Sequence, residues 1–223
     1  MKPELIIFDF DGVLVDTQAI VNKIERDWLL RHGMQMSLEE FTKRFSGMKA
    51  STIIETLRRE NNVELMKNLR EVVKDIDDTV FAELSKQKIK PIEGVKDVLQ
   101  NLAFKKCVAS NCSLKILRSL LLTSNLAQYF NGDIFSADMV QRPKPYPDLF
   151  FYASRNMNAE PEQCLVIEDS EVGVKAAVAA GMRVWGFLAG NHIDPDTHNR
   201  LLRTGAERTF QDMALLPKFL EQE

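Results

Sequence analysis

Two aspartates that follow a short apolar run are the residues of this 223-residue chain best placed for chemistry. The run Leu5–Phe8 holds only apolar residues, which is typical of a strand buried on both faces of a parallel sheet. Asp9 and Asp11 follow it, and because strand side chains alternate, both carboxylates are expected on the same side of the strand's end. Gly12 then permits a sharp turn close to a ligand, so we expect it at a substrate site.

Two carboxylates only a few ångströms apart need a compensating charge or a shared proton. Two like unit charges at such a distance repel by roughly 4 kcal/mol at an effective dielectric constant of about 20. The pair therefore indicates a cation, a shared proton or phosphate chemistry. An aspartate-rich turn at a strand end is the alternative without a function, and this spacing alone does not separate the two.

Short apolar runs that alternate with helical patterns after residue 91 predict the elements that would position such a site. Strands are expected at 106–109, 133–135, 164–167 and 183–187, with helices between them. This alternation predicts an α/β domain with a parallel, helix-covered sheet. The segment 17–88 shows helical patterns instead, for example Ser37 and Glu40, which predict a capped helix start. We therefore expect a core formed by 1–16 and 89–223, with a helical insertion at 17–88.

Ligands of open α/β sheets bind beyond the carboxyl ends of the strands, so the residues after each strand are candidates for the site. Ser110 and Asn111 follow the second predicted strand, and Glu168 and Asp169 follow the fourth. Lys144 lies between two prolines after the third. Four carboxylates around one lysine are expected to bind a divalent cation, and oxygen ligands favour Mg²⁺. The serine hydroxyl, the backbone amides near Asn111 and the lysine could bind a phosphate.

Charge and cysteine content narrow the class of partner. The net charge of -3 and the pI near 5.8 give no reason to expect nucleic acid or an anionic membrane as a partner. No apolar run reaches the roughly eighteen residues of a membrane span, and the N-terminal run is too short for a signal peptide. Three cysteines without a close pair are expected to be reduced thiols, so we expect a cytoplasmic protein, and nothing requires more than a monomer.

Taken together, four motifs resemble those of the haloacid dehalogenase-like hydrolases, in the same order along the chain. The resembling stretches are Asp9-Phe10-Asp11-Gly12-Val13, Ser110-Asn111, Lys144 within Arg-Pro-Lys-Pro, and Glu168-Asp169-Ser170. The resemblance covers nearly the whole chain. It implies a Rossmann-like parallel-sheet core with helices on both faces and a small inserted α-helical cap.

The resemblance also implies a role for each acidic motif residue. Asp9 would attack phosphorus to give an aspartyl-phosphate. Asp11 would protonate the leaving oxygen and then take a proton from the attacking water. Asp9, the backbone carbonyl of Asp11 and Asp169 would hold Mg²⁺, with Glu168 binding directly or through water.

Among the activities of the family, the resemblance favours a phosphatase. Ser110 and Lys144 would bind the phosphoryl group. The acid at Asp11 favours phosphate chemistry over dehalogenation, because a leaving alkoxide needs a proton. Segments 43–49 and 138–142 resemble the 6-phosphogluconate phosphatase type. We therefore expect a Mg²⁺-dependent phosphatase of a small sugar phosphate or sugar-acid phosphate.

Three alternatives remain open. β-Phosphoglucomutases share the four motifs but carry a histidine shortly after the first one, where this chain has Val21, which cannot relay a proton. A phosphoglycolate phosphatase would differ only in its substrate. A catalytically silent module that binds phosphate or Mg²⁺ would need a broken motif, and each of the four is intact.

The predicted helical insertion contributes further candidates for substrate binding. Arg44 and Lys49 flank Gly47 and could reach an anionic substrate. For the two cations, a solvated helix face is the alternative. Pattern alone does not choose between these two interpretations.

Overall fold

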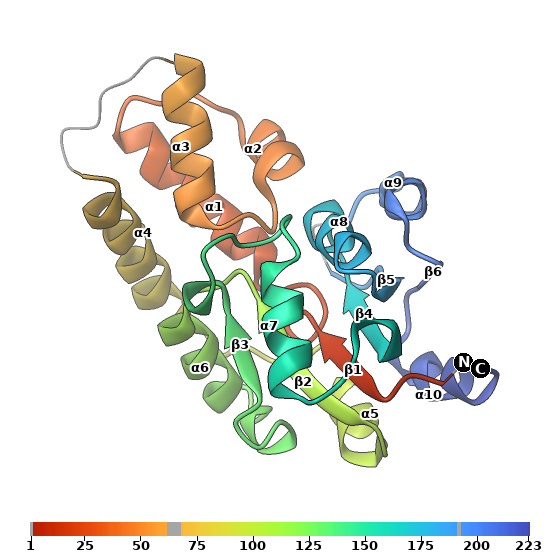
Figure 1. Ribbon diagram of the computed structural model, residues 1–223. Coiled ribbons are helices and arrows are strands. Elements are labelled where there is room, and N and C mark those ends of the chain that lie inside the picture. Colours follow the sequence, from red (N-terminus) through yellow and green to blue (C-terminus); the bar gives the residue numbers. More distant parts are fainter. Residues whose placement is uncertain (1, 62–67, 191–192) are drawn as a thin grey trace.

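The computed structural model describes residues 2–61, 68–190 and 193–223 (Figure 1). Within these residues a six-stranded sheet has the order β3-β2-β1-β4-β5-β6, and all its paired strands are parallel. β1 is central, with Phe8 in register with Val108 on one side and Ile167 on the other. The strands are β1 Leu5–Phe8, β2 Lys105–Ser110, β3 Ile134–Ser136, β4 Cys164–Glu168, β5 Arg183–Phe187 and β6 Arg208–Phe210.

Helices cover both faces of this sheet, as the alternation of β1 requires. Ile6 and Phe8 belong to one apolar core, whereas Leu5 and Ile7 belong to the other. The first core also contains residues of α5 (Val95–Asn101), α6 (Leu114–Thr123) and α10 (Leu216–Glu221). The second contains residues of α7 (Asp148–Asn156), α8 (Glu171–Ala179) and α9 (Thr197–Thr204). The predicted Rossmann-like α/β fold is thus confirmed. No helix in the described ranges has the length and apolar character needed to cross a bilayer.

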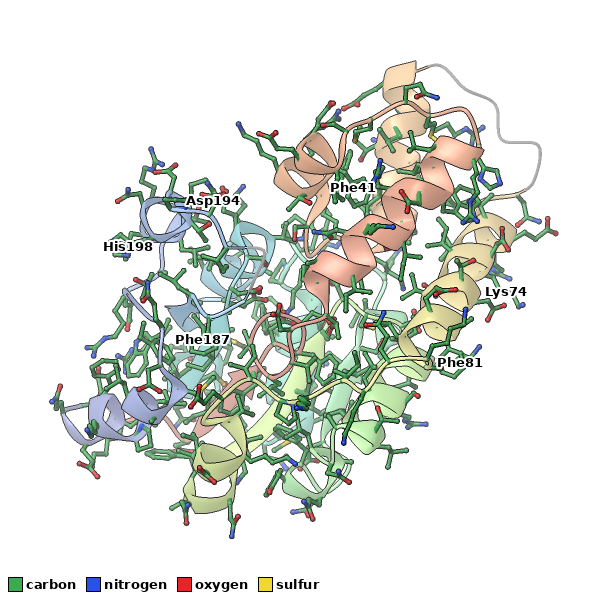
Figure 2. All side chains as sticks on the ribbon, turned by 180° about the vertical axis from the view of Figure 1, so that it is seen from behind. Phe41, Lys74, Phe81, Phe187, Asp194 and His198 are labelled. Atoms are coloured by element: carbon green, nitrogen blue, oxygen red, sulfur yellow. The ribbon has the colours of Figure 1, made fainter. Side chains whose placement is uncertain are left out.

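Four further helices lie between β1 and α5 and form a layer beside the sheet, which we call the helical unit (Figure 1). They are α1 (Gln18–Arg31), α2 (Leu38–Phe45), α3 (Ala50–Asn61) and α4 (Leu69–Leu84). The Ser37 side chain accepts a hydrogen bond from the Glu40 N–H and caps α2, as predicted. Phe41 is buried among these helices, and Lys74 points outward from α4 (Figure 2). The boundaries 1–16, 17–88 and 89–223 stay a prediction.

The edge strand β6 was not expected from the sequence. It pairs with β5 through Trp185 and Arg208, and only three residues take part. A run this short has no detectable alternation. Its pairing depends on the exposed edge that β5 offers, which local sequence does not reveal.

Candidate active site

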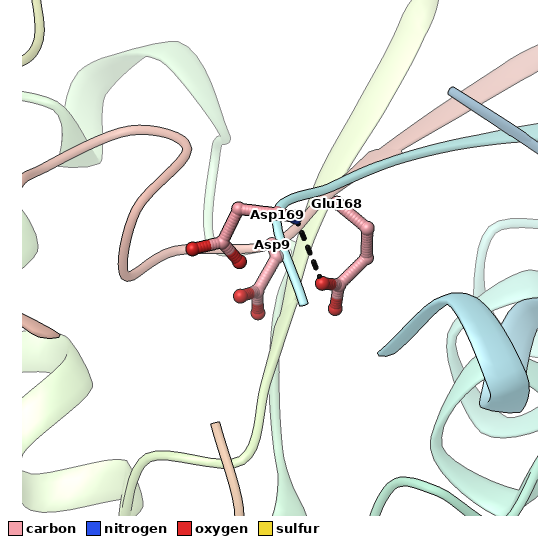
Figure 3. Close-up of side chains that lie close together, drawn as sticks. All are labelled: Asp9, Glu168 and Asp169. Atoms are coloured by element: carbon pink, nitrogen blue, oxygen red, sulfur yellow. Dashed lines mark hydrogen bonds between the residues drawn. The ribbon is translucent and has the colours of Figure 1, made fainter. Parts of the chain in front are cut away.

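The carboxyl ends of two adjacent strands, β1 and β4, bring the predicted acidic residues together. Asp9 follows β1, and Glu168 and Asp169 stand at the end of β4. Figure 3 shows these three side chains gathered at one place. One carboxylate oxygen from each lies within 4.8 Å of the others, and all three residues are buried. The neighbouring β2 ends at Ser110, at the same edge of the sheet.

Lys144 lies beside this acidic cluster and neutralises part of its charge. Its Nζ donates to Asp9 Oδ1 at 2.9 Å, to Glu168 Oε1 at 2.7 Å and to the carbonyl of Ala109 at 2.8 Å. These bonds use the three hydrogens of the ammonium group. The side chain is 2% exposed, and its Nζ lies 4.8 Å from the centroid of the Phe150 ring. It is therefore a buried, fully hydrogen-bonded cation.

Glu168 connects this lysine to the start of α8. While one carboxylate oxygen accepts from Lys144, the other accepts from the N–H groups of Asp169 and Ser170 at 3.0 and 3.1 Å. The Ser170 hydroxyl also donates to that second oxygen at 3.0 Å and, as the N-cap of α8, accepts from the Gly173 N–H. Both oxygens of Glu168 thus have protein partners.

Burial and charge shift the pKa values at the centre of the site. Burial, with the nearby charge of Glu168, raises the pKa of Asp9 well above its ordinary value, against the opposing effect of Lys144. Burial alone would lower the pKa of Lys144, but the carboxylates of Asp9 and Glu168 outweigh it and raise the pKa. Because one lysine does not balance three carboxylates, the cluster can accept a cation between Asp9 and Asp169.

Asp11 lies in the turn after β1 and lines the same pocket as Asp9. The Thr17 hydroxyl donates a hydrogen bond to Asp11 Oδ1. Gly12 has a φ of +80°, a conformation that favours glycine, and its N–H donates to the carbonyl of Val15 at 2.7 Å. Gly12 therefore shapes the turn that presents Asp11.

Ser110 and Asn111 take different positions in the pocket wall. The Ser110 hydroxyl oxygen accepts the Cys112 N–H at 3.1 Å, which leaves its hydrogen for donation. The Asn111 amide donates to the carbonyls of Gly47 and Lys144 at 2.9 and 3.1 Å and accepts from the Lys144 N–H at 3.0 Å. The Asn111 side chain thus positions the lysine segment against the helical unit, and the predicted substrate contact of Asn111 stays a prediction.

The three candidates from the helical unit divide into two groups. Gly47 and Lys49 line the pocket, and Lys49 Nζ forms an ion pair with Asp138 of the core at 2.7 Å. Arg44 does not line the pocket, because its guanidinium pairs with Glu40 and Glu60 within the helical unit. The structure therefore gives no support to a substrate contact by Arg44.

Two acidic residues of the helical unit that sequence reasoning missed also line the pocket, Glu25 of α1 and Asp77 of α4. Burial, with the charges of Asp77 and Asp11, raises the pKa of Glu25 to about 8. Burial and the charge of Asp138 raise the pKa of Asp77 to about 6. At neutral pH Glu25 is therefore mostly protonated, whereas Asp77 is mostly ionised. The signal available in the sequence was the shared helix face of Gln18, Val21 and Glu25.

We expect Glu25→Gln to stabilise the metal-free protein increasingly as the pH rises. The pKa of a glutamate in the unfolded chain is 4.5, whereas that of Glu25 in the folded protein is about 8. Because the unfolded chain releases this proton first, the wild type loses stability as the pH rises between these two values, and the glutamine variant does not. Urea unfolding should show a gain of about 2–4 kcal/mol near pH 8 and little near pH 5. A difference independent of pH would contradict the shifted pKa.

Gly173 in α8 provides space for the buried Glu168 carboxyl group. A Cβ built at this position would overlap that group directly. We expect Gly173→Ala to displace Glu168 and, through it, Lys144, and so to lower phosphatase activity about tenfold or more and stability by about 1–3 kcal/mol. Val178→Ala on the same helix is the control, since that valine is exposed. Unchanged steady-state kinetics in Gly173→Ala would show that Glu168 can move without consequence.

Comparisons with known proteins agree with this arrangement. The family model for haloacid dehalogenase-like hydrolases matches residues 6–187. The chain is 32% identical over 215 residues to 6-phosphogluconate phosphatase of Escherichia coli, covering 96% of this chain and 93% of that protein. It is 28% identical over 179 residues to fructose-1-phosphate phosphatase of the same organism, covering 79% and 92%.

A solved structure with the same fold supports the assignment. The crystal structure of a conserved haloacid dehalogenase-like protein of unknown function from Agrobacterium tumefaciens superposes with a TM-score of 0.80 at 34% identity, covering 98% of both chains. The family model spans most of the sequence and includes all four motifs. The chain therefore belongs to the haloacid dehalogenase-like hydrolases.

Proposed function

We propose that this protein is a Mg²⁺-dependent phosphatase that hydrolyses a small phosphorylated metabolite, a sugar phosphate or a sugar-acid phosphate such as 6-phosphogluconate. The enzyme class follows from the family and from the curated relatives: it is a phosphoric monoester hydrolase. The observation that carries the proposal is the buried Asp9, which accepts from Lys144 and adjoins Glu168 and Asp169 at one sheet edge. That is the arrangement expected for a nucleophilic carboxylate.

The residues at this edge fit a divalent metal with oxygen ligands. Asp9, Asp169 and the backbone carbonyl of Asp11 would hold Mg²⁺. Both oxygens of Glu168 already accept hydrogen bonds, which favours a role in fixing Lys144 and Asp169 over direct ligation. When bound, the metal would keep Asp9 ionised and attract electron density from the phosphoryl oxygens.

The side chains provide the groups for a two-step transfer. An Asp9 carboxylate oxygen attacks phosphorus while the bond to the leaving oxygen breaks, and Asp11 gives that oxygen its proton. Water then attacks the phosphorus of the aspartyl-phosphate, Asp11 takes the proton, and Asp9 is regenerated with release of phosphate. The Thr17 hydroxyl donates to Asp11 Oδ1 and so fixes the orientation of this carboxyl group in the pocket. Ser110, whose hydroxyl hydrogen is left for donation, would bind a phosphoryl oxygen, and Lys144 would do so by exchanging one of its three hydrogen bonds for the substrate.

The helical unit supports this proposal as a cap over the site. It is joined to the core by the ion pair of Lys49 with Asp138 at 2.7 Å and by that of Lys115 with Asp78 at 2.8 Å. Val21 lines the pocket where a mutase would need a proton-relaying histidine, which argues for hydrolysis over phosphosugar mutation. A phosphoglycolate phosphatase would use the same core residues.

The test is phosphate release from p-nitrophenyl phosphate, glucose-6-phosphate, fructose-1-phosphate, 6-phosphogluconate and phosphoglycolate, each with Mg²⁺ and with a chelator. We expect turnover of at least one sugar phosphate that needs Mg²⁺. Conversion of β-glucose-1-phosphate to glucose-6-phosphate without phosphate release would identify a mutase instead. Protein that binds Mg²⁺ and turns over none of these compounds would contradict the proposal and favour a silent binding module.

A further inference from the structure

The wall of the pocket opposite the acidic cluster is formed by the helical unit, and it carries two carboxyl groups. Glu25 lies on the face of α1 that also presents Gln18 and Val21 to the pocket. Asp77 comes from α4, whose Val80 is a second lining residue. The catalytic Asp9 lines the same pocket. A phosphoryl group held at the sheet edge would direct the rest of the substrate toward this wall.

Glu25 has a buried carboxyl group that can form hydrogen bonds with a ligand. The residue is 9% exposed, and no residue in the described ranges forms a hydrogen bond or an ion pair with its carboxyl group. A buried carboxyl without a partner is unfavourable, so a ligand that supplies one is favoured. Because Glu25 is mostly protonated at neutral pH, its carboxyl can donate one hydrogen bond and accept others, which matches a substrate hydroxyl.

Asp77 places a negative charge at the same wall, and the cations of the pocket are already paired with other carboxylates. Among the described residues that line the pocket, the cationic side chains are Lys49 and Lys144. Lys49 is paired with Asp138 at 2.7 Å, and Lys144 is bonded to Asp9 and Glu168. A second acid group on the substrate would therefore meet the charge of Asp77 in a poorly solvated pocket.

We propose that Glu25 hydrogen-bonds a hydroxyl of the leaving group and that the charge of Asp77 excludes a second acid group, so that the substrates are monophosphates of uncharged sugars or polyols. This inference rests on the proposed phosphatase function and narrows it from sugar and sugar-acid phosphates to the uncharged class. A pocket distinguishes substrates more strongly by a buried charge or by a hydrogen bond that the wrong substrate cannot make than by its shape alone.

A matched pair of substrates tests the inference directly. Glucitol-6-phosphate and 6-phosphogluconate share the same open six-carbon chain and phosphoester, and differ in a hydroxymethyl group against a carboxylate. For the wild type we expect kcat/KM to be at least about tenfold higher for glucitol-6-phosphate. In Asp77→Asn the ratio of kcat/KM for glucitol-6-phosphate to that for 6-phosphogluconate should fall about threefold or more. The reason is that 6-phosphogluconate becomes a better substrate once the charge that repels its carboxylate is removed.

A second variant tests hydrogen bonding by Glu25. Glu25→Met keeps the length of the side chain but removes both polar atoms, so kcat/KM for glucitol-6-phosphate should fall about tenfold or more. Its loss of rate on p-nitrophenyl phosphate, which has no hydroxyl chain, should be smaller than its loss on glucitol-6-phosphate, and its circular-dichroism spectrum should match that of the wild type. Glu55→Gln, on the exposed face of α3, is the control and should leave all three rates unchanged.

The outcomes separate the two proposals. One outcome is a wild type that hydrolyses p-nitrophenyl phosphate but uses the two substrates equally or prefers 6-phosphogluconate. That result would overturn the proposed selectivity and leave the proposed phosphatase function standing. Glu25→Met kinetics equal to those of the wild type on the polyol would overturn the role of Glu25. Failure to release phosphate from all three compounds would overturn the proposed function itself, and this inference with it.

Discussion

Phosphate release by Asp9→Asn is expected to fall about 10⁴-fold or more, while the protein stays folded. An amide has no carboxylate oxygen with which to attack phosphorus, so the aspartyl-phosphate cannot form. The fold should persist because Lys144 keeps its hydrogen bonds to Glu168 and to the carbonyl of Ala109. Burial already disfavours the charge of Asp9, so the metal-free variant should unfold at the same urea concentration as the wild type or a higher one.

Two measurements decide this prediction. Steady-state phosphate release reports the chemistry, and urea unfolding followed by circular dichroism reports the fold. Asp97→Asn, an exposed substitution of the same type on α5, should leave both unchanged. A residual Asp9→Asn rate within tenfold of the wild type would mean that another group attacks phosphorus.

Most of the core site was predictable because it depends on strand ends. Asp9, Ser110 and Asp169 follow directly from where apolar runs stop, and parallel strands bring their carboxyl ends to one edge. The unusual lysine between two prolines was also visible in the sequence. Its three hydrogen bonds were not, because they depend on the path of the loop before α7.

The pocket residues of the helical unit could not be predicted in the same way. Residues of α1 and α4 meet at the pocket only because the unit packs on the sheet edge in one particular orientation, which periodicity does not specify. Glu25 and Asp77 were therefore missed. The charge of Arg44 and its nearness to Gly47 in the sequence suggest a substrate contact, yet its guanidinium pairs with Glu40 and Glu60. Local sequence predicts helices well and their mutual placement poorly.

Asn111 and Gly173 show a second limit. Their types were visible, but the sequence could not show that the Asn111 amide binds two backbone segments or that Gly173 faces a buried carboxyl group. Both contact the segments that hold Lys144 or Glu168 and so help to position those side chains. Such supporting roles depend on distances between segments far apart in the chain.

Replacing Lys144 by methionine should have the largest combined effect on activity and stability. Asp9 and Glu168 would lose their shared counter-charge while still buried, and breaking a buried ion pair by removing one partner costs about 3–5 kcal/mol. The loss should be larger near pH 8 than near pH 5, because the pKa of Asp9 is raised and its carboxyl group can escape the loss by binding a proton. Phosphate release should fall at least about 10³-fold, since the phosphoryl group loses its buried cation.

A double-variant cycle separates loss of charge balance from loss of packing. Adding Glu168→Gln to Lys144→Met removes one of the two unpaired charges, so the double variant should regain about 1–3 kcal/mol of stability over Lys144→Met in urea unfolding, without regaining activity. Lys175→Met on α8, an exposed lysine, should change stability by less than about 0.5 kcal/mol. If Glu168→Gln gives no recovery, the lysine stabilises the core mainly by filling space beside Phe150, and the electrostatic account of this site is wrong.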